Sequence, residues 1–354
     1  MLFDPFTLRG LTLRNRIGVS PMCQYSSRDG FADDWHLVHL GSRAVGGAGL
    51  VFTEATAVEA RGRISPEDLG LWKDEHVPAL ERVTRFVRAQ GAAAGVQLAH
   101  AGRKGSTARP WEGGRPLEPP RGWRPIVGPS ALPFDEGFPV PEALSPDGIA
   151  AIIEAFAAAA RRALAAGFDV VEVHAAHGYL LHEFLSPVSN RRDDAWGGSF
   201  DGRVRLFVEV VRAVRRHWPD ARPLCVRLST TDWLGPDGWQ VEDSIALARR
   251  LRAEGVDLLD CSSGGIAPRV PIDAGPGYQT ANAARLRAEA ALPTAAIGLI
   301  TSPAQAEHVL RTGQADMVFL ARALLRDPYW PLRAAAELGA AIAWPPQYER
   351  ARPR

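Results

Sequence analysis

Short runs of apolar and β-branched residues alternate along the chain with longer segments of helical periodicity. The run at 168–173 follows a helical pattern that ends at Gly167, and it has the length and composition of a buried strand in a parallel sheet. Seven more such runs lie at 14–20, 49–54, 93–98, 224–228, 256–261, 294–297 and 316–320. Helical patterns cover 77–88, 149–166, 203–217, 241–254 and 282–290, with further helices beginning at Asp33 and after Pro328. The pattern therefore predicts eight alternations of strand and helix.

Eight alternations without a linker predict a single (β/α)8 TIM barrel of the α/β class. A doubly wound sheet is the second choice, because such sheets seldom reach eight strict alternations. The length of 354 residues suits one barrel with insertions. We expect extended loops after strand three, to about Val140, and after strand six, from Ser262. Long loops inside a domain are usually functional, and the first is predicted to be a partly ordered lid.

Active sites of such barrels lie at the carboxyl ends of the strands. The residues at or just beyond these ends are more polar than we expect of loops that only connect strands to helices. They are Cys23, Tyr25, Ala55, Gln97, His100, His174, His177, Tyr179, Arg227, Ser262, Gly298 and Arg322. No pair of Asp or Glu residues stands out among them. The set therefore disfavours glycosidase chemistry, which needs two carboxylates.

Three of these residues, His174, His177 and Tyr179, follow the same strand. Two imidazoles and a phenol here could converge on one small polar atom, such as a carbonyl oxygen that gains negative charge during a reaction. The alternative is that they are polar side chains that cap a loop. His100, His174 and His177 could also supply three ligands of a metal-dependent hydrolase, although no carboxylate partners for them are evident.

The loops after the last two strands indicate a phosphate site. Gly298 and Arg322 follow strands seven and eight, where barrels commonly bind phosphate through backbone N–H groups and a helix N-terminus. The chain has no Gly-x-x-x-x-Gly-Lys-Ser/Thr loop, so ATP is not suggested. The pattern favours a phosphorylated cofactor.

The charge balance points away from nucleic-acid and membrane partners. The chain has 41 Lys and Arg against 40 Asp and Glu, a formal net charge of +1. Its cysteines, Cys23, Cys225 and Cys261, lie far apart without a C-x-x-C motif, which indicates a reducing compartment. The N-terminus lacks the apolar core of a signal peptide, and no apolar run has the length of a membrane span. We expect a cytoplasmic protein.

Further motifs extend over nearly the whole chain. They are Asn15-Arg-Ile, Ser20-Pro-Met-Cys-Gln-Tyr25, Gln97-Leu-Ala-His-Ala-Gly-Arg-Lys104, Glu172-Val-His-Ala-Ala-His-Gly-Tyr-Leu180, Leu185-Ser-Pro-Val-Ser-Asn-Arg191, Gly197-Gly-Ser and Gln347-Tyr-Glu-Arg350. In this combination the chain resembles the old yellow enzyme family of FMN-dependent ene-reductases, specifically its thermophilic-like subclass. The most specific single motif is the stretch from His174 to Tyr179.

The resemblance implies a barrel over 1–340 that binds FMN noncovalently and accepts hydride from NADPH. Pro21, Met22, Cys23, Ala55, Gln97 and Arg227 would surround the isoalloxazine ring, and Gly298 and Arg322 would hold the phosphate. Arg227 suits a ring edge that gains negative charge on reduction, although it could instead form a salt bridge inside the barrel. Cys23 marks the subclass and would modulate the flavin potential, whereas a lone cysteine is more often a small buried hydrophobe.

The same resemblance implies the reaction. N5 of FMN would deliver hydride to Cβ of an α,β-unsaturated ketone or aldehyde while His174 and His177 bind its carbonyl oxygen. Tyr179 would protonate Cα, and its ordinary phenol pKa would suffice for that. Tyr25 would add a hydrogen bond to the substrate.

The resemblance also extends to assembly. The segment 341–354 would reach a neighbouring subunit and place Arg350 at its substrate pocket, in a homodimer that pairs into a homotetramer. The chain departs from the family at Ala321, where Gly is common, and in the loop 103–134, which is longer and richer in Trp and Pro than in compact members. The resemblance therefore implies the class of reaction and does not identify the substrate. The nearest alternative is a related FMN barrel reductase of dienoyl thioesters, but this chain has neither its iron–sulfur cysteines nor its additional C-terminal domains.

Overall fold

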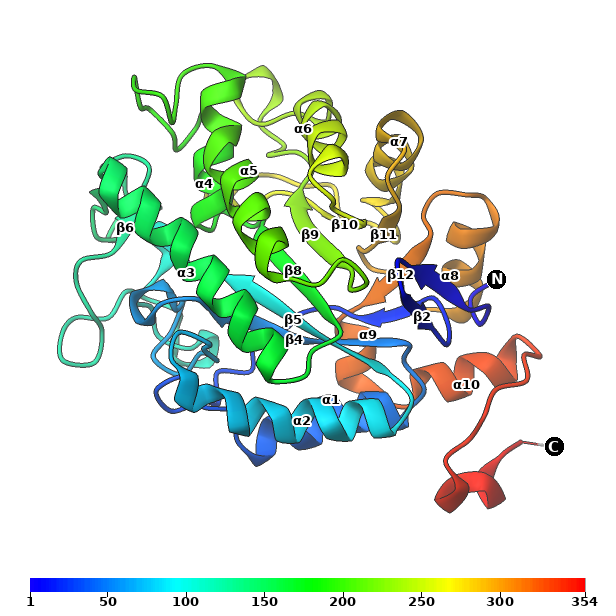
Figure 1. Ribbon diagram of the computed structural model, residues 1–354. Helices are drawn as coiled ribbons and strands as arrows, with labels where there is room; N and C mark the ends of the chain where they lie inside the picture. The colour runs from blue at the N-terminus through cyan, green and yellow to red at the C-terminus, as the bar shows by residue number, and fades with distance from the viewer. Residues whose placement is uncertain (354) are drawn as a thin grey trace.

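Eight parallel strands form a closed barrel at the centre of the computed structural model, which describes residues 1–353 (Figure 1). In order around the barrel they are β3 (Ile17–Val19), β4 (Leu50–Ala57), β5 (Ala93–Ala99), β8 (Val170–Ala175), β9 (Leu224–Ser229), β10 (Leu258–Ser262), β11 (Thr294–Ala296) and β12 (Met317–Leu320). β12 pairs with β3, which closes the ring. The predicted barrel and all eight predicted strands are confirmed.

Helices surround the barrel (Figure 1). They are α1 (Asp34–Val45), α2 (Val77–Ala89), α3 (Pro146–Ala165), α4 (Leu180–Leu185), α5 (Phe200–His217), α6 (Val241–Ala253), α7 (Thr280–Ala290), α8 (Pro303–Arg311), α9 (Arg322–Arg326) and α10 (Trp330–Glu337). Ser145 and Ser199 cap α3 and α5, accepting from Gly148 N and Gly202 N. Both helices begin one turn earlier than predicted, because Asp and Gly in their first turns interrupt the apolar period. Among the helices of residues 1–353, none is both long enough and apolar enough to cross a membrane.

A short antiparallel hairpin, β1 (Phe6–Leu8) and β2 (Leu11–Leu13), has no counterpart among the predicted elements. Its leucines join a buried cluster that includes the first residues of β4, β5, β8, β10 and β12. The hairpin therefore closes the amino-terminal end of the barrel. Strands of three residues are too short to show an alternating pattern, which is why periodicity does not reveal them.

The extended loops after β5 and β10 are confirmed. The first contains a pair of two-residue strands, β6 (Val127–Gly128) and β7 (Glu142–Ala143), which are too short for a recognisable period. Arg103 of this loop donates from Nη2 to the carbonyl of Ile266 in the second loop at 2.6 Å. Since both loops follow carboxyl ends of strands, this bond ties them together on the face where the site residues lie.

The C-terminal segment leaves the barrel after α10 and extends away from it (Figure 1). It contains a 3-10 helix over Pro346–Ala351, in which Tyr348 lies against Tyr329 with ring centroids 5.9 Å apart. Arg350 is exposed to solvent.

Candidate active site

The carboxyl ends of the strands surround a cavity of about 280 Å³. Five of the predicted strand-end residues line it, namely His177, Arg227, Ser262, Gly298 and Arg322. They come from β9, from the end of β10 and from the segments after β8, β11 and β12. The barrel therefore brings these separate parts of the chain together on the predicted face.

One end of the cavity is basic. Gly298 has a φ of +116°, and a Cβ there would lie 2.9 Å from Gln279 Nε2 and 3.1 Å from the Tyr278 ring, so only glycine fits. Arg322 begins α9, and Arg326 lines the same cavity one turn later. Two guanidinium groups beside a glycine turn suit a phosphate. The sequence reasoning missed Arg326, although its spacing from Arg322 would have revealed it.

Arg227 lines the cavity from β9 and contacts the buried carboxyl group of Asp260. Its Nε lies 3.2 Å from Asp260 Oδ2, and its Nη1 donates to Ser20 Oγ at 3.2 Å. Gln97 Nε2 donates to Glu172 Oε1 at 2.8 Å. Both carboxylates have no exposed surface, and burial raises the pKa of each. The salt-bridge role considered for Arg227 is therefore present, and the same side chain also faces the cavity.

Glu172 and Asp260 escaped the sequence reasoning, which found no carboxylate pair at the strand ends. They lie one layer deeper in the barrel. Each precedes a strand-end polar residue by two positions, His174 and Ser262 respectively, and side chains two apart in a strand point to the same face. Both would have been found if the search had included the residue two positions before each polar residue at a strand end.

His174, His177 and Tyr179 converge as predicted. The ring centroid of His174 lies 5.2 Å from that of His177 and 5.2 Å from that of Tyr179. His177 has a φ of +60°, which is uncommon for a residue other than glycine. Its N–H donates to Ser229 Oγ at 2.9 Å, and its Nε2 lies 2.6 Å from Ser262 Oγ. These contacts hold the strained residue in one orientation.

Burial keeps this cluster uncharged. It lowers the pKa of both imidazoles well below the usual value, and the charge of Arg227 lowers them further. Burial also raises the pKa of the Tyr179 phenol well above its usual value, and the neighbouring Cys23 and Tyr25 add to the effect. A neutral imidazole has one N–H to donate. The buried Nδ1 of His174 has no hydrogen-bond partner within residues 1–353.

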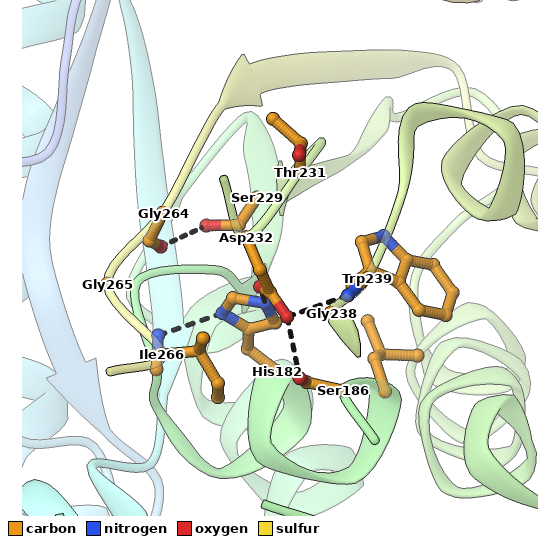
Figure 2. A network of polar contacts seen from close by, with 12 residues as sticks. His182, Ser186, Ser229, Thr231, Asp232, Gly238, Trp239, Gly264, Gly265 and Ile266 are labelled. Carbon is orange, nitrogen blue, oxygen red and sulfur yellow. Dashed lines mark hydrogen bonds and ion pairs between the residues drawn. The ribbon is translucent and has the colours of Figure 1, made fainter. Parts of the chain in front are cut away.

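A buried polar network connects the turn after β8 to the loop after β9, and Figure 2 shows its members His182, Ser186, Asp232 and Trp239. Gly178 N donates to His182 Nδ1 at 2.9 Å, so His182 Nε2 carries the proton that it donates to Asp232 Oδ1 at 2.9 Å. Ser186 Oγ and Trp239 N donate to the other oxygen of Asp232, at 2.6 and 2.8 Å. The sequence reasoning assigned His182 no role, because its partner Asp232 lies on a distant segment.

The remaining ring-side residues follow β3. Pro21, Met22, Cys23 and Tyr25 are half-buried there, while Ala55 is buried in β4. Burial raises the pKa of the Cys23 thiol, which favours the S–H form over a thiolate. The Tyr25 ring contacts Trp111 of the long loop after β5, with centroids 5.6 Å apart. That loop therefore reaches the site, as expected of a lid.

His100 does not join the site. Its Nε2 lies 2.8 Å from Glu59 Oε1, and its Nδ1 accepts from Gly102 N at 3.0 Å. His100 is therefore not placed to act with His174 and His177 as a third imidazole ligand of a metal ion. Across the part of the chain that the structure describes, no three His, Cys, Asp or Glu residues are arranged to hold a metal ion.

The barrel, the basic end of its cavity and the uncharged donor cluster define a flavin-dependent oxidoreductase. The residues present fit FMN, because a phosphate can meet the guanidinium groups of Arg322 and Arg326 beside the glycine turn at Gly298. The chain belongs to the NADH:flavin oxidoreductase / NADH oxidase family, whose model matches residues 1–340. This membership confirms the resemblance to the old yellow enzymes and FMN as the cofactor.

Relatives and solved structures agree with this assignment. NADPH dehydrogenases of Geobacillus thermodenitrificans and Bacillus licheniformis are 50% and 47% identical over 352 residues, covering 99% of this chain and 98% of each relative. Morphinone reductase superposes with a TM-score of 0.80 at 29% identity, over 98% of this chain and 92% of its own. 2-Naphthoyl-CoA reductase superposes with a TM-score of 0.85 at 27% identity over 96% of this chain. It is a longer enzyme, and the superposition covers 52% of its chain.

Proposed function

We propose that this protein is an ene-reductase that uses FMN and NADPH to reduce the activated C=C bond of α,β-unsaturated ketones or aldehydes. The observation that carries the proposal is the cluster of His174, His177 and Tyr179 beside the cavity that suits FMN. Its similarity to NADPH dehydrogenases and to morphinone reductase supports NADPH as the reductant and reduction as the reaction class.

In this proposal the histidines bind the substrate and the tyrosine protonates it. The neutral imidazoles of His174 and His177 each donate one hydrogen bond to the substrate carbonyl oxygen, which stabilises the negative charge that develops there. The Tyr179 phenol, kept protonated by burial, gives its proton to Cα. FMN, when bound, supplies the hydride for Cβ. Tyr25 contributes a further hydrogen bond to the substrate.

The proposed cofactor contacts follow the shape of the site. Gly298 and Arg322 hold the phosphate, with Arg326 as a second cation. Gln97 and Arg227 face the ring, and their bonds to the buried carboxylates fix both side chains in place. Pro21, Met22, Cys23 and Ala55 complete the ring environment, and the Cys23 thiol tunes its potential.

The long loop after β5 bounds the substrate side. Trp111 packs on Tyr25, and Lys104 Nζ lies 4.4 Å from the centroid of Phe134 and 5.3 Å from that of Tyr179. An aromatic and cationic wall of this kind favours flat, polar-ended substrates such as cyclic enones. Because the loop 103–134 differs from that of compact relatives, the substrate range is specific to this chain.

The test is a pair of anaerobic half-reactions. NADPH should bleach the bound flavin, and a cyclic enone should restore its colour in a single exponential phase at a rate that rises with enone concentration. A coenzyme A thioester of a conjugated acid serves as the alternative substrate. Restoration by the thioester but not by the enone would support the dienoyl thioester reductase, and restoration by neither would remove the ene-reductase assignment.

We propose that the protein is a homodimer, pairing into a homotetramer, and that Arg350 enters the partner's substrate pocket. The support is an apolar groove of about 590 Å³ beside the C-terminal segment, lined by Tyr329, Leu332, Trp344 and Tyr348 among others. Exposed apolar grooves of this size commonly mark protein contacts.

Replacing Arg350 by alanine should raise the enone KM several-fold and leave bound FMN unchanged, because none of the proposed phosphate contacts lies in that segment. Arg352→Ala is the matched control, since it removes an exposed arginine two residues away. Steady-state kinetics and light scattering of both variants provide the measurement. Equal KM values for the two variants would contradict the proposed role of Arg350.

The cytoplasm is the compartment that we propose for the reaction. All three cysteines, Cys23, Cys225 and Cys261, are free thiols. Free thiols are the usual state of cysteine in a reducing compartment.

A further inference from the structure

A second, much smaller cavity lies next to the proposed acid Tyr179. Alanines of β4, of the end of β5 and of the segment just beyond it line this cavity together with Gly62 and Ile64, and only two side chains in the lining carry polar atoms, those of Tyr179 and Asp68. Its volume is about 10 Å³. That is roughly the space that one water molecule requires, and a water there would have a polar group on each side.

Asp68 is buried, with 1% of its surface exposed. Its Oδ2 accepts from Ile64 N at 2.6 Å, whereas its Oδ1 has no hydrogen-bond partner among residues 1–353. A buried carboxyl oxygen without a partner is costly, so a group in the adjoining cavity is needed to satisfy it. Nothing in the proposed cofactor or substrate binding uses this residue.

The surroundings of Asp68 favour its protonated form. Burial raises the pKa of this carboxyl well above its usual value, and the charge of Glu54 raises it further, while Arg63 partly opposes the effect. The other titratable groups on this side are Cys23 and Tyr25, whose own pKa values burial raises. These surroundings therefore favour the carboxylic acid form of Asp68, which has a proton to donate, over the carboxylate.

We propose that Asp68 returns a proton to Tyr179 after each reduction, through one water molecule held in this small cavity. The proposal rests on the ene-reductase function given above. Once the Tyr179 O–H bond has broken and its proton has moved to the substrate, a water O–H bond breaks to restore the phenol, and the Asp68 O–H bond breaks to restore the water. One proton moves in total, no electrons are exchanged, and the Asp68 carboxylate regains its proton from solvent after product release.

The site requires a donor that returns a proton to Tyr179 after each reduction, and this route provides one. The charged phenolate of Tyr179 is disfavoured by burial, and the alanine walls behind it offer no other donor. Asp68 acts through Tyr179 and touches neither substrate nor flavin, so it is a positioning and proton-supplying residue and not a catalytic one.

Infrared spectroscopy of the resting protein tests whether the Asp68 carboxyl is protonated, and it needs no turnover. The wild-type protein should show protonated-carboxyl absorption at neutral pH, to which other buried acids such as Glu172 also contribute, and Asp68→Asn should remove one component of it. Tyr179→Phe should shift it, because the bridging water loses its second partner. Glu67→Gln, at the neighbouring carboxylate, is the matched control and should change nothing. An ionised Asp68 at neutral pH, or a band that Tyr179→Phe leaves unmoved, would overturn the proposal.

Single-turnover kinetics test the transfer itself. After one enone reduction the ultraviolet signal of tyrosinate should decay at least about tenfold more slowly in Asp68→Asn than in wild type, within the range that a positioned acid contributes. In a Tyr179→Phe background, Asp68→Asn should have no further effect on enone reduction. An equal loss in both backgrounds would show a merely structural role and overturn the proposal.

The two measurements separate this inference from the function on which it rests. A wild-type protein that does not reduce enones would refute the ene-reductase assignment, and the infrared comparison would still decide whether Asp68 holds a proton beside Tyr179. If Asp68→Asn does not fold, the infrared spectra of the wild-type and Tyr179→Phe proteins decide the same question.

Discussion

Replacing His174 by alanine should slow hydride transfer to an enone by about 10²–10³-fold, while reduction of the flavin by NADPH stays close to the wild-type rate. In our proposal the imidazole donates to an oxygen that becomes negative only during the oxidative half-reaction. Loss of one such donor costs about 3 kcal/mol in comparable sites. Stopped-flow measurement of the two half-reactions separates this effect from general damage.

His100 offers a matched control for that experiment. It directly follows β5, much as His174 lies near the end of β8, but its imidazole is bound to Glu59 and lies outside the donor cluster. His100→Ala should therefore lower stability without the selective loss in the enone half-reaction. Equal losses in both half-reactions of His174→Ala would mean that this residue orients the flavin or the nicotinamide, and an unimpaired enone half-reaction would exclude it from the site.

Replacing Arg227 by methionine should lower the free energy of unfolding by about 3–5 kcal/mol, because it leaves the buried carboxyl groups of Asp260 and Glu172 without a cation. A second substitution, Asp260→Asn, should recover most of the loss by removing one of the two acids. Urea unfolding of flavin-free protein gives the measurement, since bound flavin would add its own stabilisation.

The pH dependence of the Arg227→Met variant provides a further check. Burial already raises the pKa of both carboxyls, and loss of the guanidinium raises it more. A group with a raised pKa in the folded state contributes stability at low pH and loses it as pH rises through that pKa. The deficit of the variant should therefore shrink in acid and grow towards alkaline pH.

An exposed ion pair supplies the control for the buried one. Arg212 and Glu254 pair at 2.5 Å, with 45% and 23% of their side-chain surfaces exposed. Arg212→Met should cost less than about 1 kcal/mol, because water replaces the lost partner. If Arg227→Met also lowers the free energy of unfolding by less than about 1 kcal/mol, the Arg227 guanidinium does not stabilise the buried carboxyl groups.

The barrel and much of the site could be predicted from the sequence because both depend on local order. Strands buried on both faces must be continuous apolar runs, so the eight strands were recognisable one at a time. His174, His177 and Tyr179 lie within one stretch of six residues at the end of one such strand, and the end of that strand places them together. The sequence alone thus determined the fold class, the family and the face of the barrel on which the candidate site lies.

The roles of isolated polar residues were decided only by the tertiary structure. His100 and His174 occupy similar places beside strand ends, yet Glu59 engages the first and leaves it no part in the site. Asp68 and Tyr179 line one small cavity because the loop after β4 folds back against β4 and β5. What a buried polar side chain does depends on the atom opposite it, and that atom comes from another part of the chain. Periodicity places a residue on a face of its own element, whereas its partner across the barrel is set by the closure of eight strands.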